Sequence, residues 1–339
     1  MYNDGEEIIN PKVLWSWANF DGIHYLTISR NGYGLYQQAF FPLYPATIRF
    51  LAPLFNGKDL LAGIFISNFC FLVFLYFLYK LVCLDYHDSV AKKTLIFFVV
   101  FPTSFFLGMV YTESLFLMLV IGSFYAARKN RWLMAGILGG LASYTRLVGI
   151  FLFPALLYEW WSGREVRNEK WELRNMLKVF IIPAGLLIYM KFLWQRYGDP
   201  LMFFHVQPFF GAERSSSRII LIYQVFWRYF KMIFTTKLDP LYFAVWLEFL
   251  VAISFLVLLV LSYKNKIRVS YLIFGLFSYI VPTLSGTFLS LPRFVLTLFP
   301  CFILLGTTKN KPLKVFLLVL FGFMFIVSAS LFFRGYWVS

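Results

Sequence analysis

Long apolar segments alternate with short polar connections along most of the chain. The runs 60–83, 241–263 and 313–333 approach or exceed the ~20 apolar residues that a helix needs to cross the bilayer core. Lipid offers the backbone no hydrogen-bond partner, so these segments should satisfy their own amide and carbonyl groups as helices. The pattern therefore predicts an all-α, polytopic membrane protein.

The same pattern predicts about ten transmembrane or half-membrane helices. Two short runs meet at Arg146, and at about 1.5 Å of rise per residue neither can cross the membrane alone. We expect them to be broken helices that neighbouring helices shield from lipid, an arrangement that tends to line a cavity. The predicted limits of the spans are 59–83, 94–111, 113–127, 132–144, 147–160, 177–194, 241–263, 269–285, 292–306 and 313–333.

Composition and charge agree with a membrane location. Of the 339 residues, 60% are hydrophobic and 14% are charged, against roughly 25% charged in soluble domains. A net charge of +15 could indicate nucleic acid binding in a soluble protein, but here the basic residues gather in short connections between apolar runs. That placement is typical of cytoplasmic loops, so we expect no nucleic acid partner. The basic clusters lie at 80–93, 128–131, 164–178, 264–268 and 309–314.

With these loops inside, three longer regions fall on the outer side: 1–58, 195–239 and 285–293. We treat 1–339 as one domain, in which 1–58 is an outer-face catalytic loop with interfacial helices and 195–239 a second large outer loop. An outer N-terminal region ordinarily follows a transmembrane helix, so we expect that a first helix is missing from this chain. The alternative is translocation of an acidic N-terminal tail.

Asp21 is the candidate for chemistry in the first outer region. The glycine after it favours a turn or a helix start, where a carboxylate is accessible. Its flanks are aromatic, because two tryptophans and Phe20 precede it and His24 and Tyr25 follow. Asp21 could therefore be a simple N-cap, or a base whose pKa is raised by apolar neighbours.

Tyr44 belongs to the run Phe-Phe-Pro-Leu-Tyr-Pro at 40–45. Two prolines among aromatic residues are not ordinary helix interior and predict a rigid re-entrant or interfacial turn. Most of these rings suit an aromatic belt at the level of the lipid headgroups. The functional alternative is contact with a lipid-linked substrate.

Three charged residues fall at predicted junctions of spans. Glu113 stands at the outer junction of two spans, where it is either a functional intramembrane acid or a helix cap. Arg146 lies at a depth where an unpaired cation is costly, so its partner should be a phosphate or an acid such as Glu113. Arg293, at the outer start of a span, could hold a phosphate through two hydrogen bonds or extend to the membrane interface.

The second outer loop contains His205 and Gln207 in an aromatic context after a Gly-Asp-Pro turn. A lone histidine is more often structural than catalytic. Arg214 and Arg218 could hold an anionic substrate, although a solvated loop is the favoured interpretation of this pair.

No metal or nucleotide motif accompanies these residues. The histidines are scattered, no Asp-x-Asp pair occurs, and Walker A and Gly-x-Ser-x-Gly motifs are absent. Cys70, Cys83 and Cys301 lie in apolar runs and indicate packing. These absences favour a metal-independent reaction, without a cofactor, on a membrane-resident donor.

Six motifs in this order are shared with a known family: Trp-x-x-x-Asp-Gly-x-His-Tyr-Leu at 17–26, Gly-Tyr at 32–33, and the motifs at 40–45, 111–116, 145–149 and 291–294. The chain resembles the PIG-V-type mannosyltransferases, whose eukaryotic members act as the second GPI mannosyltransferase. The sequence departs from the family where a phenylalanine replaces the tryptophan common beside the Asp. A Phe-rich composition that also contains Lys and Asn suggests a bacterial member.

The resemblance implies a GT-C fold and transfer of mannose from a polyprenyl-phosphate donor with inversion. The acceptor would be a hydroxyl of a glycan, glycolipid or protein, and the location the plasma membrane of a bacterium or the endoplasmic reticulum membrane of a eukaryote. Asp21 matches the family's base. The candidate substrate-binding residues are His24, Tyr25, Tyr44, Glu113, Arg146, His205, Gln207 and Arg293.

Two other functions remain open at this point. A transporter or flippase of a lipid-linked substrate would also use intramembrane charges and broken helices. A noncatalytic subunit of a glycosyltransferase complex would need a partner subunit.

Overall fold

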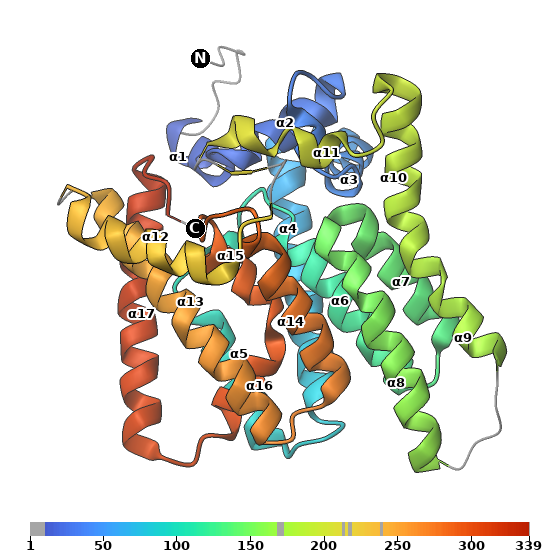
Figure 1. Ribbon diagram of the computed structural model, residues 1–339. Coiled ribbons are helices and arrows are strands. Elements are labelled where there is room, and N and C mark those ends of the chain that lie inside the picture. Colours follow the sequence, from blue (N-terminus) through green and yellow to red (C-terminus); the bar gives the residue numbers. More distant parts are fainter. Residues whose placement is uncertain (1–10, 168–172, 212–213, 216–218, 238–239, 339) are drawn as a thin grey trace.

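A computed structural model describes residues 11–167, 173–211, 214–215, 219–237 and 240–338. Within these residues the secondary structure is helical throughout, and the long helices run roughly parallel to form one bundle (Figure 1). The expected all-α polytopic fold is therefore confirmed. Residues 1–10 of the first outer region, and Arg218, lie outside the described residues.

Four helical stretches are long and apolar enough to cross a membrane, as judged from length and composition: Asp59–Val82, Leu173–Tyr197, Tyr242–Lys264 and Lys311–Phe333. The other helices are shorter. Among them, α6 (Glu113–Arg128) is almost wholly buried by its neighbours. The helices of the bundle are α4 (Asp59–Val82), α5 (Asp88–Val99), α6 (Glu113–Arg128), α7 (Trp132–Thr145), α8 (Leu152–Arg167), α9 (Leu173–Val179), α10 (Ile181–Tyr197), α13 (Pro240–Lys264), α14 (Val269–Thr283), α16 (Phe299–Thr307) and α17 (Lys311–Phe333).

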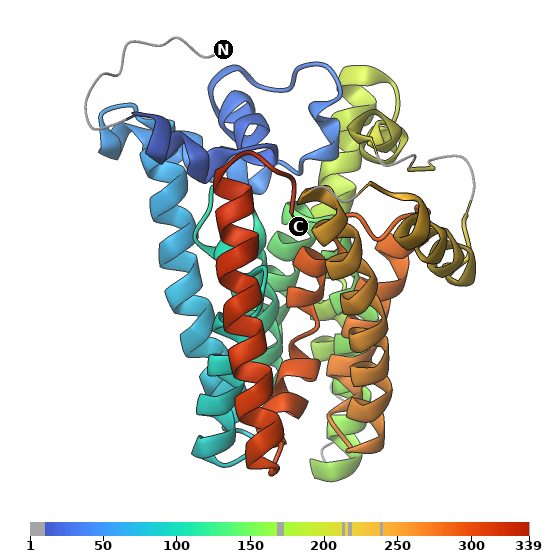
Figure 2. The same ribbon diagram turned by 90° about the vertical axis from the view of Figure 1, so that its left-hand side faces the viewer.

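Short helices cover one end of this bundle (Figures 1 and 2). We call it the cavity end, and it lies at the top of Figure 1. The short α-helices are α1 (Pro11–Trp15), α2 (Asp21–Asn31), α3 (Leu43–Leu51), α11 (Met202–His205), α12 (Ile222–Thr235) and α15 (Leu291–Phe294). The 3-10 helices are η1 (Ser16–Ala18), η2 (Gln37–Ala39), η3 (Ala52–Phe55), η4 (Ser104–Leu107), η5 (Leu147–Phe151), η6 (Gln207–Phe210) and η7 (Val295–Thr297).

The opposite end, which we call the basic end, carries the connections α4–α5, α6–α7, α13–α14 and α16–α17 (Figure 1). These connections contain most of the lysine and arginine clusters of the sequence. The basic clusters thus lie at one end of the bundle, as expected if successive spans alternate in direction.

Two predicted spans differ from the structure because proline interrupts them. The predicted helix 94–111 ends at Val99, and the buried segment that follows contains Pro102, which has no amide hydrogen to continue a helix. The predicted span 292–306 is divided into α15, η7 and α16, with Pro300 in the first turn of α16. The expected turn at 40–45 is shorter than predicted, because α3 begins at Leu43 and accommodates Pro45 in its first turn.

The predicted break at Arg146 is present. Helix α7 ends at Thr145, Arg146 has an extended backbone (φ −154°, ψ 145°), and η5 leads into α8. A β-carbon on Gly149 would lie 2.4 Å from the carbonyl carbon of Ala142, so the chain turns back here with no room for a side chain. This break aims the Arg146 guanidinium toward the centre of the cavity end.

Candidate active site

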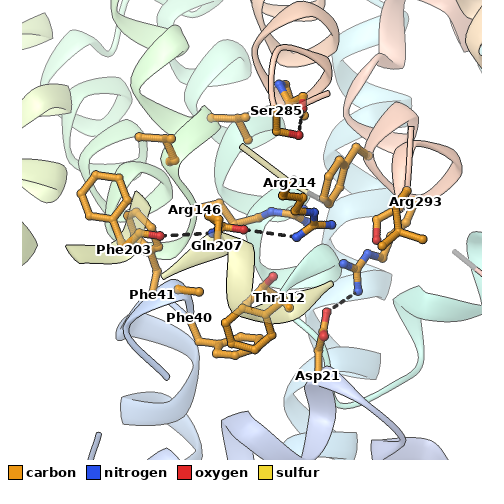
Figure 3. A pocket seen from close by; sticks show the side chains of 18 of the residues that line it. Asp21, Phe40, Phe41, Thr112, Arg146, Phe203, Gln207, Arg214, Ser285 and Arg293 are labelled. Carbon is orange, nitrogen blue, oxygen red and sulfur yellow. Dashed lines mark hydrogen bonds and ion pairs between the residues drawn. The ribbon is translucent and has the colours of Figure 1, made fainter. Parts of the chain in front are cut away.

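A cavity of about 810 Å³ lies among the helices at the cavity end (Figure 3). Its wall is formed by the start of α2, the start of α6, the α7–η5 junction, the α11–η6 segment and the α14–α15 connection. Segments from across the sequence therefore contribute to one site.

Asp21 is the first residue of α2 and is held by contacts with the C-terminal segment. The preceding Phe20 has φ +58°, a conformation that non-glycine residues adopt uncommonly. Its ring packs against Phe332 and Trp337, with centroids 5.6 and 4.8 Å away. The side-chain amide of Asn19 donates to the Phe332 carbonyl at 3.1 Å. These contacts hold the backbone in the conformation that turns Asp21 into the cavity.

Four charged residues form a continuous chain across the cavity. Arg293 Nη1 donates to Asp21 Oδ2 at 2.8 Å, and its Nε lies 3.3 Å from Glu113 Oε1. Arg146 Nη1 donates to the same Glu113 oxygen at 2.9 Å. The structure thus brings together Asp21, Glu113, Arg146 and Arg293, and the sequence alternative in which Arg146 pairs with Glu113 is the one observed.

Each carboxylate in this chain retains an unused oxygen. Asp21 Oδ1 accepts no hydrogen bond from the described residues, whereas Oδ2 is held by Arg293. Glu113 Oε2 is buried and also has no hydrogen-bond partner within the described chain. A hydroxyl group of a substrate could supply the hydrogen bond that either oxygen lacks.

Aromatic residues form the wall beside Asp21. His24 stacks on Phe40 with ring centroids 4.8 Å apart, and its Nδ1 lies 3.4 Å from Gln37 Nε2. Burial lowers the pKa of His24, and the charge of Asp21 only partly opposes this effect. Burial, with the charges of Asp21 and Glu113, raises the pKa of Tyr25. Both side chains therefore face the cavity as neutral groups at neutral pH.

Gln207 lies on the opposite wall with Arg214. The Gln207 side-chain amide donates to the Phe203 carbonyl at 3.1 Å, and its Oε1 accepts from Arg214 Nη1 at 3.2 Å (Figure 3). For Arg214 the favoured sequence interpretation, a solvated loop, is wrong, because this residue lines the cavity. An arginine beside small polar residues in a loop carries no sequence signal that separates these two cases.

Tyr44 and His205 do not line the cavity. Tyr44 is fully buried, and its hydroxyl bonds with the Gly63 carbonyl at 3.1 Å and with Ser67 Oγ at 2.7 Å. His205 is half exposed and pairs with Asp199 at 2.7 Å. The structure gives both a packing or surface contact in place of the substrate contact predicted from sequence.

Trp337 is a cavity residue that sequence reasoning missed. Its ring lies 5.6 Å from the Arg293 guanidinium carbon, and its buried indole nitrogen has no hydrogen-bond partner in the described part of the chain. The tryptophan follows the last predicted span by only a few residues, in a segment without a recognisable motif. Only the folding of the C-terminal segment over the cavity reveals its position.

The described residues contain no group of three or more His, Cys, Asp and Glu side chains that could hold a metal ion. Both cavity carboxylates are instead paired with guanidinium groups. A reaction without a metal or cofactor stays a prediction.

The fold and the cavity define a multi-pass membrane protein with a charged site at one end of its helical bundle. The chain belongs to the mannosyltransferase (PIG-V) family, whose sequence profile matches residues 6–263. The resemblance expected from the six motifs is thereby confirmed.

A similar protein is GPI mannosyltransferase 2 of Schizosaccharomyces pombe, which is 34% identical over 143 residues. The matched part is 40% of this chain, and it spans 30% of the length of that relative. No solved structure matches the chain significantly.

Proposed function

We propose that this protein transfers mannose from a polyprenyl-phosphate donor to a hydroxyl of a glycan, glycolipid or protein acceptor, with inversion at the anomeric carbon. Membership of the mannosyltransferase family supports the transferred sugar. The observation that carries the proposal is the chain of Asp21, Arg293, Glu113 and Arg146 in one cavity. Such a site offers both a base and positive charge for a phosphate leaving group.

Asp21 acts as the general base in this proposal. The acceptor hydroxyl donates its proton to Asp21 Oδ1 while its oxygen attacks the anomeric carbon of the donor. The bond from that carbon to the phosphate oxygen breaks at the same time, and polyprenyl phosphate leaves with the electron pair. Arg293 holds Oδ2, so it orients the carboxylate and leaves Oδ1 for the acceptor hydroxyl.

Glu113 and the two paired arginines organise the site around the reacting atoms. The Glu113 carboxylate holds Arg146 and Arg293 through one oxygen, and its unpartnered Oε2 accepts a hydroxyl of the bound sugar. The guanidinium groups add positive charge where the phosphate develops negative charge. The polyprenyl chain of the donor stays in the lipid around the helical bundle.

Replacement of Asp21 tests the proposal. In purified full-length protein supplied with polyprenyl-phosphate mannose and a hydroxyl acceptor, Asp21→Asn should lower transfer by at least about 100-fold, because a positioned general base contributes roughly that much. Radiolabelled mannose in the product is the measurement.

Asp199→Asn is the matched control, since Asp199 is a carboxylate near the same end of the bundle that lies outside the cavity. It should retain transfer close to the unmodified level. Transfer by Asp21→Asn at the unmodified rate would exclude Asp21 as the base.

A further inference from the structure

Arg214 is a cavity cation that forms no direct ion pair with a described carboxylate. Its hydrogen bond goes to the neutral side chain of Gln207, at 3.2 Å. Arg146 and Arg293, in contrast, are both paired with carboxylates. Burial lowers the pKa of Arg214, and the charges of Asp21 and Glu248 oppose this only in part. A buried cation without a counter-charge is costly, and a bound anion would remove that cost.

Among the described residues, the charges that line the cavity do not cancel. Three guanidinium groups, from Arg146, Arg214 and Arg293, face the two carboxylates of Asp21 and Glu113. One positive charge is therefore in excess, and Arg214 is its source. A sugar linked to a lipid through a phosphodiester brings one negative charge, which matches the excess, and guanidinium groups bind phosphate oxygens in a favourable planar geometry.

The backbone around Arg214 places this cation beside an apolar surface. The Ser215 amide donates to the Ser285 carbonyl at 2.9 Å, and the Ile220 amide donates to the Leu284 carbonyl at 3.1 Å. These bonds hold Ser215 and Ile220 beside the end of α14, where Ile219, Val281 and Leu284 line the cavity. A phosphate at Arg214 would thus have apolar side chains beside it for the first units of a lipid chain.

We propose that Arg214 binds the phosphoryl group of the lipid-linked donor, while Arg293 and Arg146 stay paired with Asp21 and Glu113. This inference rests on the proposed function for the nature of the donor. It assigns separate tasks to the three arginines, since Arg214 anchors the phosphate of the bound donor. The other two position the carboxylates and add positive charge as the phosphate leaves. Gln207 orients the Arg214 guanidinium through the hydrogen bond to its Oε1.

The test is direct binding, measured without any transfer step. Full-length protein in lipid nanodiscs is titrated with radiolabelled polyprenyl phosphate, with polyprenol and with inorganic phosphate. Arg214→Gln should weaken polyprenyl phosphate binding by about tenfold or more, since a hydrogen bond to a charged group is worth roughly that factor. Binding of polyprenol, which has no phosphate, should be equal in the two proteins.

Three further variants complete the experiment. Arg214→Lys keeps the charge and should lose less affinity than Arg214→Gln, which separates loss of the cation from a folding defect. Arg196→Gln removes an exposed arginine at the end of α10, outside the cavity, and should bind like the unmodified protein. Asp21→Asn should bind polyprenyl phosphate even where its transfer is lost.

Equal binding of polyprenyl phosphate by Arg214→Gln and by the unmodified protein would overturn the inference. Tight binding of inorganic phosphate that displaces the lipid phosphate would also overturn it, since the site would then accept free phosphate. If Arg214→Gln loses binding but the unmodified protein transfers no mannose, the phosphate site stands and the proposed function fails. The binding and transfer measurements therefore distinguish the two failures.

Discussion

Glu113 connects the two paired arginines of the cavity through a single carboxylate oxygen. Its side chain is 3% exposed, while those of Arg146 and Arg293 are 15% and 8% exposed. Three charges at this depth are stable together only because each has a partner of opposite sign. At the scale of single residues, Glu113 is therefore required both for the shape of the site and for its stability.

Glu113→Gln should lower the free energy of unfolding by about 3 kcal/mol, because it leaves two buried guanidinium groups with reduced compensation. Mannose transfer should fall as well, since the ion pair with Glu113 that helps to hold Arg293 beside Asp21 is lost. Thermal unfolding in detergent and the transfer assay provide the two measurements.

The matched substitution for Glu113→Gln is Asp88→Asn. Asp88 forms an ion pair with Lys92 on the surface, where water screens the charges, so little change is expected in either measurement. Equal stability of Glu113→Gln and the unmodified protein would contradict the proposed role of Glu113.

At the scale of elements, glycine residues let α7 approach α9 and α10 closely. A β-carbon on Gly185 would lie 1.9 Å from the Gly140 carbonyl oxygen, and one on Gly136 would lie 2.2 Å from the Lys178 carbonyl oxygen. Gly136 and Gly140 stand four residues apart, the spacing at which small residues let membrane helices pack backbone to backbone. Helix α7 leads to Arg146 and α10 supports the segment with Gln207, so this crossing positions two walls of the cavity.

Gly185→Ala should destabilise the protein by about 1–3 kcal/mol, because the added methyl group would force the two helices apart. Gly322→Ala is the control in α17, where a β-carbon meets no atom within 4 Å. Comparison of the two thermal unfolding midpoints tests this prediction. A smaller loss for Gly185→Ala than for Gly322→Ala would show that α7 and α10 do not require this close approach.

At the scale of the whole molecule, a second charged cluster closes the basic end of the bundle. Arg128 from α6 donates to both Asp85 oxygens at 2.6 and 2.7 Å. Arg268 Nε lies 3.0 Å from Glu159 Oε2, and Ser270 Oγ donates to the same oxygen at 2.6 Å. Here two arginines balance two carboxylates, so this cluster has no excess charge, unlike the cavity. This balance of charge is typical of a cluster that holds helices together, here α4, α6, α8 and α14.

Removal of one charge at the basic end should affect stability without affecting substrate binding. Glu159→Gln leaves Arg268 and Arg128 without their shared buried partner, and should cost about 3 kcal/mol of unfolding free energy. The KM for the lipid-linked donor should stay unchanged, because Glu159 does not line the cavity. A change in donor KM measured for the folded Glu159→Gln variant would show that the two ends are coupled.

The sequence by itself determined the helical membrane architecture of this protein. Apolar length fixes where a chain can cross lipid, so most predicted spans agree with observed helices, and the break at Arg146 was found from the shortness of its flanking runs. The predictions for 94–111 and 292–306 were less accurate because apolar residues also fill buried non-helical segments. Motifs that occur in a fixed order identified the family, although they could not show which side chains meet.

Only the tertiary structure determined which residues line the cavity. Arg214 and Tyr44 illustrate the reason, because a solvated loop was the favoured interpretation of the first and the second was a candidate for substrate contact. Packing decided both, because hydrogen bonds hold Ser215 and Ile220 beside the end of α14 and the Tyr44 hydroxyl bonds with Ser67 Oγ. Contacts between residues far apart in the sequence, such as Asp21 with Arg293, depend on how whole helices pack, and no local pattern encodes them.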